Sequence, residues 1–163
     1  MKAGILSMAL IVAIAATGCL KNNQQPVDTS GAVKAILIGS WTGTTSNIAY
    51  YDATGNEAGS ATLPSVNLKF DSQSNLTETT TGTTPTTLSG TYSVITDATG
   101  SNYLVTSGVV GNHTYAIASA TSGTLALYEQ LAVATGATTT INGKTVTYYS
   151  TIQISSYSKN SSN

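Results

Sequence analysis

The sequence contains no arginine, one histidine (His113) and one cysteine (Cys19), and only 8% of its 163 residues are charged. Six lysines and seven acidic residues leave a net charge of -1, so the chain lacks the clustered cations that neutralise nucleic-acid phosphates. One cysteine forms no internal disulfide, and one cysteine with one histidine is too few ligands for a usual zinc site. We therefore predict no nucleic-acid partner, no metal and no cofactor.

Apolar runs long enough to span a membrane are also absent. The mostly apolar segment from Ala3 to Ala16 follows Lys2. At about 14 residues it is too short to cross a hydrocarbon core, and it fits the central region of a signal peptide. It ends in Ala16-Thr17-Gly18-Cys19, which resembles the lipobox of bacterial lipoproteins, with Ala16 in place of the usual larger aliphatic residue. The resemblance implies that residues 1–18 are removed and Cys19 is lipidated; the alternative is an ordinary secretory signal with a free thiol.

The residues after Cys19 indicate a tether and a location. Residues 19–30 are mainly polar and include Pro26, which is typical of a linker. No aspartate follows Cys19, and in Gram-negative sorting this resembles retention at the outer membrane, on its periplasmic or its surface face. We expect a signal peptide (1–18), a lipidated tether (19–30), a folded domain (31–158) and a disordered tail (159–163).

Serine and threonine are abundant, with 20 and 29 residues, and they alternate with apolar residues in the folded domain. Such a period of two predicts β-strands with one buried face and one solvated face. Threonine suits the solvated face because a β-branched polar side chain favours extended backbone. The apolar residues expected to share a face include Val66, Leu68 and Phe70; Leu88, Tyr92 and Val94; Leu125, Leu127, Leu131 and Val133; and Val146, Tyr148, Ile152 and Ile154.

Turn signals divide the domain into short strands. The segments 52–56 and 97–101 are near copies, and each has a glycine where a hairpin turn needs positive φ. A short helix is expected over Asp28–Ile38, with Ser30 as a possible cap. The pattern favours an all-β, eight-stranded antiparallel up-and-down barrel with this short N-terminal helix; an antiparallel β-sandwich is the alternative. The strands are expected near 40–51, 62–71, 75–81, 87–96, 102–109, 113–120, 124–133 and 144–157.

Four short motifs carry a resemblance to a known family: Leu37-Ile38-Gly39-Ser40-Trp41, Phe70-Asp71-Ser72, Ser89-Gly90-Thr91-Tyr92 and Leu125-Ala126-Leu127. Over residues 33–157 the chain resembles the lipocalins, and more closely the lipocalin-like domains of bacterial outer-membrane lipoproteins. The resemblance implies that Trp41 closes the base of the barrel. The ligand-carrying lipocalins lay an arginine from late in the barrel across this tryptophan. This chain has no arginine, and Lys144 cannot stack in the same planar way.

No catalytic grouping is visible in the sequence, so we predict no enzymatic activity. There is no G-x-S-x-G motif, and His113 follows Gly111-Asn112, where we expect a solvated turn residue. Six of the seven acidic residues are expected in or next to turns or at strand ends. Glu129 differs because it shares the parity of Leu125 and Leu127, which makes it the best candidate for a polar group in a ligand cavity, although we favour a position at the rim, near the strand end. Three tyrosines have inward parity and either fill the lumen or line it for a ligand: Tyr92, Tyr115 and Tyr148.

These observations predict a membrane-anchored, lipocalin-like lipoprotein of the bacterial cell envelope. We expect it to bind a small apolar or amphipathic molecule without catalysis. The alternative is an adhesion or interaction module that contacts protein or polysaccharide through a Thr/Tyr-rich outer face, including Tyr149 and Tyr157. A lumen of a few hundred Å³ reached by Glu129 favours the first function, and a filled barrel with outward tyrosines favours the second.

Overall fold

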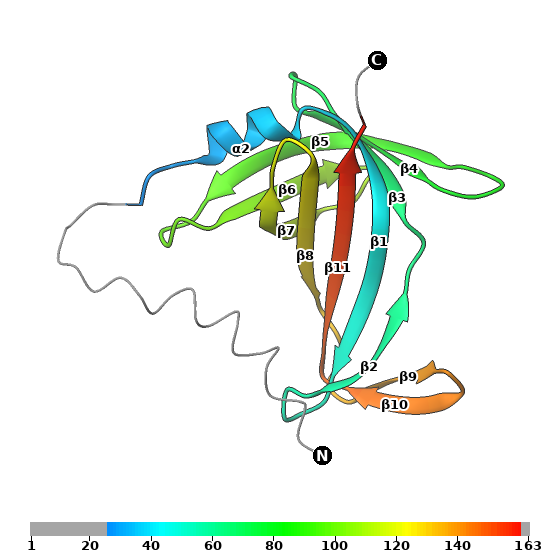
Figure 1. Ribbon diagram of the computed structural model, residues 1–163. Coiled ribbons are helices and arrows are strands. Elements are labelled where there is room, and N and C mark those ends of the chain that lie inside the picture. The colour runs from blue at the N-terminus through cyan, green and yellow to red at the C-terminus, as the bar shows by residue number, and fades with distance from the viewer. Residues whose placement is uncertain (1–25, 161–163) are drawn as a thin grey trace.

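The computed structural model describes residues 26–160, which form one short helix and a closed antiparallel barrel (Figure 1). The main sheet has the order β11-β8-β7-β6-β5-β4-β3-β1-β2, and β11 also pairs with β1. This pairing closes eight strands into an up-and-down barrel and leaves β2 attached outside the closure. The predicted barrel with a short N-terminal helix is therefore confirmed, and the sandwich is excluded. The elements are α2 (Ser30–Leu37), β1 (Gly39–Tyr51), β2 (Glu57–Thr62), β3 (Val66–Phe70), β4 (Asn75–Thr80), β5 (Thr87–Thr96), β6 (Asn102–Gly108), β7 (His113–Ala120), β8 (Thr124–Leu131), β9 (Ala137–Ile141), β10 (Lys144–Tyr148) and β11 (Ser150–Lys159).

Three aspartates, Asp52, Asp71 and Asp97, stabilise hairpin turns in the same way. Each carboxylate accepts hydrogen bonds from the backbone N–H groups two and four residues further along the chain, at 2.8–3.0 Å. The two near-copy turns place Gly55 and Gly100 at φ +80° and +87°, a conformation that suits glycine. The turns predicted from these segments are thus confirmed, together with their physical reason.

Two of the predicted strands differ from the structure. The segment 62–71 is interrupted at Leu63-Pro64-Ser65, so that β2 pairs with the second half of β1 while β3 takes the barrel position. Proline lacks the N–H that a central strand would donate, which explains the break. The segment 144–157 divides after Tyr148: β10 pairs with β9 in a separate hairpin, and β11 closes the barrel. The predictions lack β9 and, except for Thr62, β2. Strand β11 continues to Lys159, which was expected in the tail.

The division also changes which side chains of β11 face the lumen. Ser155 faces Ser46 across the β1–β11 pair, with the two hydroxyls 3.0 Å apart, and Tyr157 belongs to the buried core. Alternation then turns Ile152 and Ile154 outward, where Ile152 pairs with Ala49. The prediction that these isoleucines face inward is wrong, and so is the prediction that Tyr157 faces outward.

Helix α2 and the residues around Trp41 close one end of the barrel. The helix packs against β5 and β7, and Trp41 is fully buried, with its Nε1–H donating to the Leu37 carbonyl at 2.7 Å. Lys159 places its Nζ 5.1 Å from the centre of the Trp41 ring and donates to the Ile36 carbonyl at 2.7 Å. The cation over the tryptophan is therefore Lys159, whereas Lys144 lies exposed on β10. Apolar side chains pack beneath this end: Leu37, Phe70, Leu76, Tyr92, Leu104, Leu125 and Leu127.

The structure does not extend to the predicted membrane anchor. The signal peptide, Cys19 and most of the tether lie outside the described residues. Within residues 26–160, no helix is long and apolar enough to span a membrane.

Candidate ligand-binding site

The half of the lumen away from Trp41 contains a cavity of about 330 Å³. Its floor is formed by the packed core, including Leu68, Leu104 and Leu127. Its walls carry hydroxyl, amide, imidazole and carboxylate groups from six strands. The polar lining residues are Ser46, Glu78, Thr106, His113, Glu129, Gln153 and Ser155.

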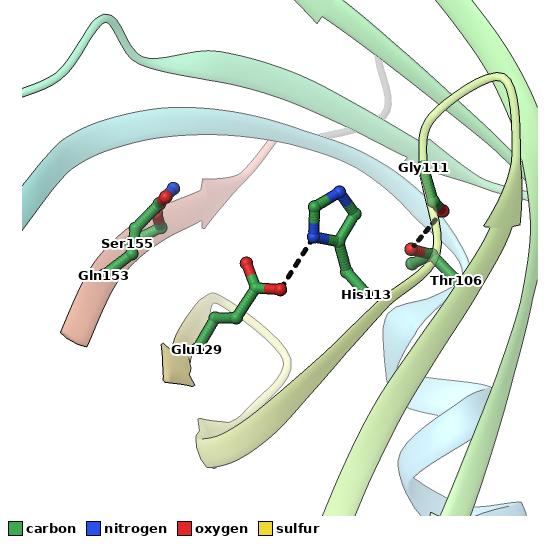
Figure 2. Close-up of polar contacts among 6 residues, drawn as sticks. All are labelled: Thr106, Gly111, His113, Glu129, Gln153 and Ser155. Carbon is green, nitrogen blue, oxygen red and sulfur yellow. Dashed lines mark hydrogen bonds and ion pairs between the residues drawn. The ribbon is translucent and has the colours of Figure 1, made fainter. Parts of the chain in front are cut away.

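His113 and Glu129 form a close pair in this cavity (Figure 2). The Nδ1 atom of His113 lies 2.7 Å from Oε1 of Glu129, and the His113 ring stacks on Tyr115, with centroids 5.5 Å apart. The side chains of His113 and Glu129 are 36% and 11% exposed, so the histidine is the more accessible partner. His113 opens β7 with its side chain in the lumen, so the expectation of a solvated turn histidine is wrong. Glu129 points inward as its parity indicated and lies buried in the cavity wall, so the favoured expectation of a rim position is wrong.

Glu78 is a second carboxylate in the same cavity. It lies within β4 on the face of Leu76 and pairs with Leu68 of β3. No residue of the described chain donates a hydrogen bond to its carboxylate, and burial raises the pKa of Glu78, with the nearby His113 opposing this in part. The expectation that Glu78 lies in or next to a turn or at a strand end is wrong. The signal that identifies it is its parity with Leu76, two residues earlier.

The predicted tyrosines lie in three different places. Tyr115 lines the cavity, and burial, together with the charge of Glu129, raises its pKa far above the ordinary value. Tyr92 is buried in the packed end, where its hydroxyl donates to the Asp71 carbonyl at 2.9 Å. Tyr148 belongs to the β9–β10 hairpin, outside the barrel strands, and its ring packs on that of Tyr50 at 4.8 Å. Only Tyr115 of these three therefore contributes to the cavity.

Tyr157 was not among the predicted ligand residues, yet it lines the cavity from β11. Burial raises the pKa of Tyr157 to about 12. Its inward position follows from the alternation within β11, where Tyr157 shares the parity of Ser155. An alternation counted from β10 gives the opposite face, because β10 and β11 are separate strands.

Further polar groups surround the pair. Thr106 is buried and donates to the Gly111 carbonyl at 3.1 Å, which fixes the loop before His113 (Figure 2). Gln153 and Ser155 project from β11 (Figure 2). On the same face of β11, Thr151 is 2% exposed and its hydroxyl has no partner among the described residues. This part of the lumen holds more hydrogen-bonding groups than the described protein atoms satisfy.

The arrangement suits binding by charge and hydrogen bonds. A serine-type triad would need a hydroxyl bonded to Nε2 of His113, and no described residue supplies one. Nor does any group of three or more histidine, cysteine, aspartate or glutamate residues in the described part of the chain form a possible metal site. No protein-family model matches the sequence, and no curated protein matches it.

Proposed function

We propose that the chain is a lipid-anchored, lipocalin-like lipoprotein of the bacterial cell envelope, at the outer membrane, that binds a small amphipathic molecule in its barrel without catalysis. The observation that carries the proposal is the cavity of about 330 Å³, which falls within the range of known ligand pockets. Its apolar floor suits the hydrocarbon part of a ligand, and its polar wall around Glu129 suits a head group. A purely apolar molecule would leave that wall without partners.

An adhesion module is the weaker alternative. It is favoured by an exposed tyrosine stripe, such as Tyr149 and Tyr157 on the outer face of the last strand. Tyr149 is exposed, but Tyr157 is buried in the lumen. The cavity and the inward tyrosine both favour ligand binding.

The ligand is tested by native mass spectrometry of the full chain purified from its host. We expect an adduct of small mass that is lost in Ser155→Phe, because the ring fills the cavity from β11. Ser156→Phe is the matched control, since Ser156 is the next residue and faces the outside of the barrel. An adduct that persists in Ser155→Phe, or a wild-type protein with no adduct, contradicts binding in the lumen.

The anchor is tested separately by radiolabelled palmitate. Cells that express the full chain should label the protein, and Cys19→Ser should abolish the label because Cys19 is the only cysteine. The wild-type protein should also fractionate with the outer membrane. Label that survives Cys19→Ser would contradict the proposed lipidation.

A further inference from the structure

We propose that the ligand is a cation: the lumen is a site for an amphipathic amine whose ammonium group is held by Glu78 and Glu129. The inference rests on the proposed function and specifies its ligand class. It comes from the charge of the cavity, from carboxylate oxygens that have no donor among residues 26–160, and from the aromatic side chains beside them.

The ionisable residues that line the cavity give it a net negative charge. Glu78 and Glu129 line it, and the only positive charge that can oppose them within the described residues is a protonated His113. One imidazolium against two carboxylates still leaves the wall negative. A concave site with low-dielectric walls concentrates this field, so it attracts cations and repels carboxylates and phosphates.

The lysines of the described chain are all placed elsewhere. Lys34 donates to Ser74 at 2.6 Å, near the closed end of the barrel, and Lys159 lies over Trp41. Lys69 and Lys144 are exposed and do not line the cavity. No lysine within residues 26–160 therefore neutralises the two carboxylates.

Unused acceptor atoms give the cavity its specificity. Glu129 uses Oε1 for His113, and no described residue donates to its other oxygen. Glu78 has no donor for either oxygen in the described part of the chain, although burial has removed part of its hydration. An ammonium group carries three donors, so one head group can donate to more than one carboxylate oxygen. A ligand alcohol would bring one donor and no charge.

Aromatic and apolar surfaces complete the match. Tyr115 and Tyr157 line the same cavity, and a cation within about 6 Å of a tyrosine ring is attracted by its π-face. Leu63, Pro64 and Leu131 add apolar lining beside the polar wall. These surfaces suit a hydrocarbon chain that follows the ammonium group, which distinguishes an organic amine from an inorganic cation.

The test compares three probes of one chain length by isothermal titration calorimetry of the full chain: octylamine, octanol and octanoate. At neutral pH we expect octylamine to bind at least about tenfold more tightly than octanol, the difference that one charge-assisted hydrogen bond provides. Octanoate should bind more weakly than octanol because its carboxylate meets Glu78 and Glu129. Calcium and sodium chloride at the same concentrations should give no saturable heat.

Two variants test whether the Glu78 carboxylate causes the tighter binding of octylamine. Glu78→Gln should weaken octylamine binding about tenfold and leave octanol binding unchanged, because the amide keeps the size of the side chain and loses the charge. Glu57→Gln is the matched control: it makes the same change on exposed strand β2 and should change neither affinity. Circular dichroism and urea unfolding establish that both variants fold.

The outcomes separate this inference from the proposed function. If octanol and octylamine bind alike, or if Glu78→Gln leaves octylamine binding unchanged, the cation inference is overturned while ligand binding in the lumen stands. If a metal ion binds and octylamine does not, the site is for an inorganic cation and the amine is excluded. If no probe binds and the native protein carries no adduct, both proposals fail.

Discussion

Replacing Lys159 with methionine should loosen the closed end of the barrel, because one ammonium group makes two contacts there. Its Nζ donates to the Ile36 carbonyl at 2.7 Å, in the last turn of α2, and lies 5.1 Å from the centre of the Trp41 ring. The stem reaches these partners by crossing Gly39, where an added Cβ would lie 2.9 Å from Cε of Lys159. Methionine keeps most of the length of the stem and removes the charge and the donors.

The size of the effect follows from these contacts. A hydrogen bond to a charged group contributes about 1.5–3 kcal/mol, and a cation over an aromatic face about 0.5–2 kcal/mol. The two terms share one ammonium group, and the side chain is only partly buried, so they do not add in full. We expect Lys159→Met to lower the free energy of unfolding by about 2–3 kcal/mol. Lys159→Arg should lose less, because the guanidinium can keep both contacts.

Urea unfolding followed by fluorescence measures this directly, since Trp41 is the only tryptophan in the chain. Lys144→Met is the matched control: it makes the same substitution on exposed β10 and should stay within about 0.5 kcal/mol of the wild type. A Lys159→Met protein that is also within about 0.5 kcal/mol of the wild type would refute the reasoning.

Three further predictions concern the core, the cavity and a turn. Phe70→Ala should cost about 3–5 kcal/mol in urea unfolding, because the buried ring packs edge-on against Tyr92 at 4.9 Å; a loss below about 1 kcal/mol would contradict this packing. The folded protein holds the Glu78 proton to a higher pH than the unfolded chain, so wild-type stability should fall as pH rises above the ordinary pKa of 4.5. Urea unfolding of Glu78→Gln at acid and neutral pH should show no such loss of stability. Identical pH profiles of stability for the variant and the wild type would contradict the raised pKa of Glu78. Hydrogen bonds, above all from the Thr99 hydroxyl, lower the pKa of Asp97 from 3.8 to about 2. The ionised Asp97 should therefore stabilise the folded protein fully above pH 3.8, and this contribution should be lost as the pH falls through about 2. An NMR titration of the Asp97 carboxyl carbon with an ordinary midpoint would contradict this.

The barrel could be predicted from the sequence because alternation and turn chemistry are local signals. The segments 52–56 and 97–101 specify hairpins through an aspartate and a glycine only a few residues apart. The incorrect predictions on the last strand arose because one alternating pattern runs across two separate strands, β10 and β11. Tyr148 and Ile152 both fit an alternating strand, but the chain leaves the β9–β10 hairpin between them and begins the barrel strand anew. Parity counted through such a break has no meaning, and this is why the inward faces of β11 were reversed.

The candidate site was predicted only in part, because its residues meet across strands. Glu129 could be found from parity within β8, but its partner His113 lies at the start of β7, and only the pairing of the strands brings the two within 2.7 Å. Glu78 was missed although its parity with Leu76 was visible. A carboxylate that faces a packed barrel core is unfavourable, so an exposed position is the simpler prediction for Glu78. That expectation fails here because this half of the lumen is a cavity.

Strand β11 provides an independent argument that the polar half of the lumen serves a purpose other than stability. The strand has isoleucines at 152 and 154, yet it turns Gln153 and Ser155 into the lumen. A shift of one residue would exchange these faces, and burying an isoleucine side chain contributes about 1.5–3 kcal/mol. The observed register is instead held by Tyr157 in the core, by the Ser46–Ser155 contact and by the strand end over Trp41. Local violations of the hydrophobic pattern are expected where a site requires them. Because this violation lies beside two carboxylates with unused oxygens, the register of β11 and the charge of the cavity point to the same binding site.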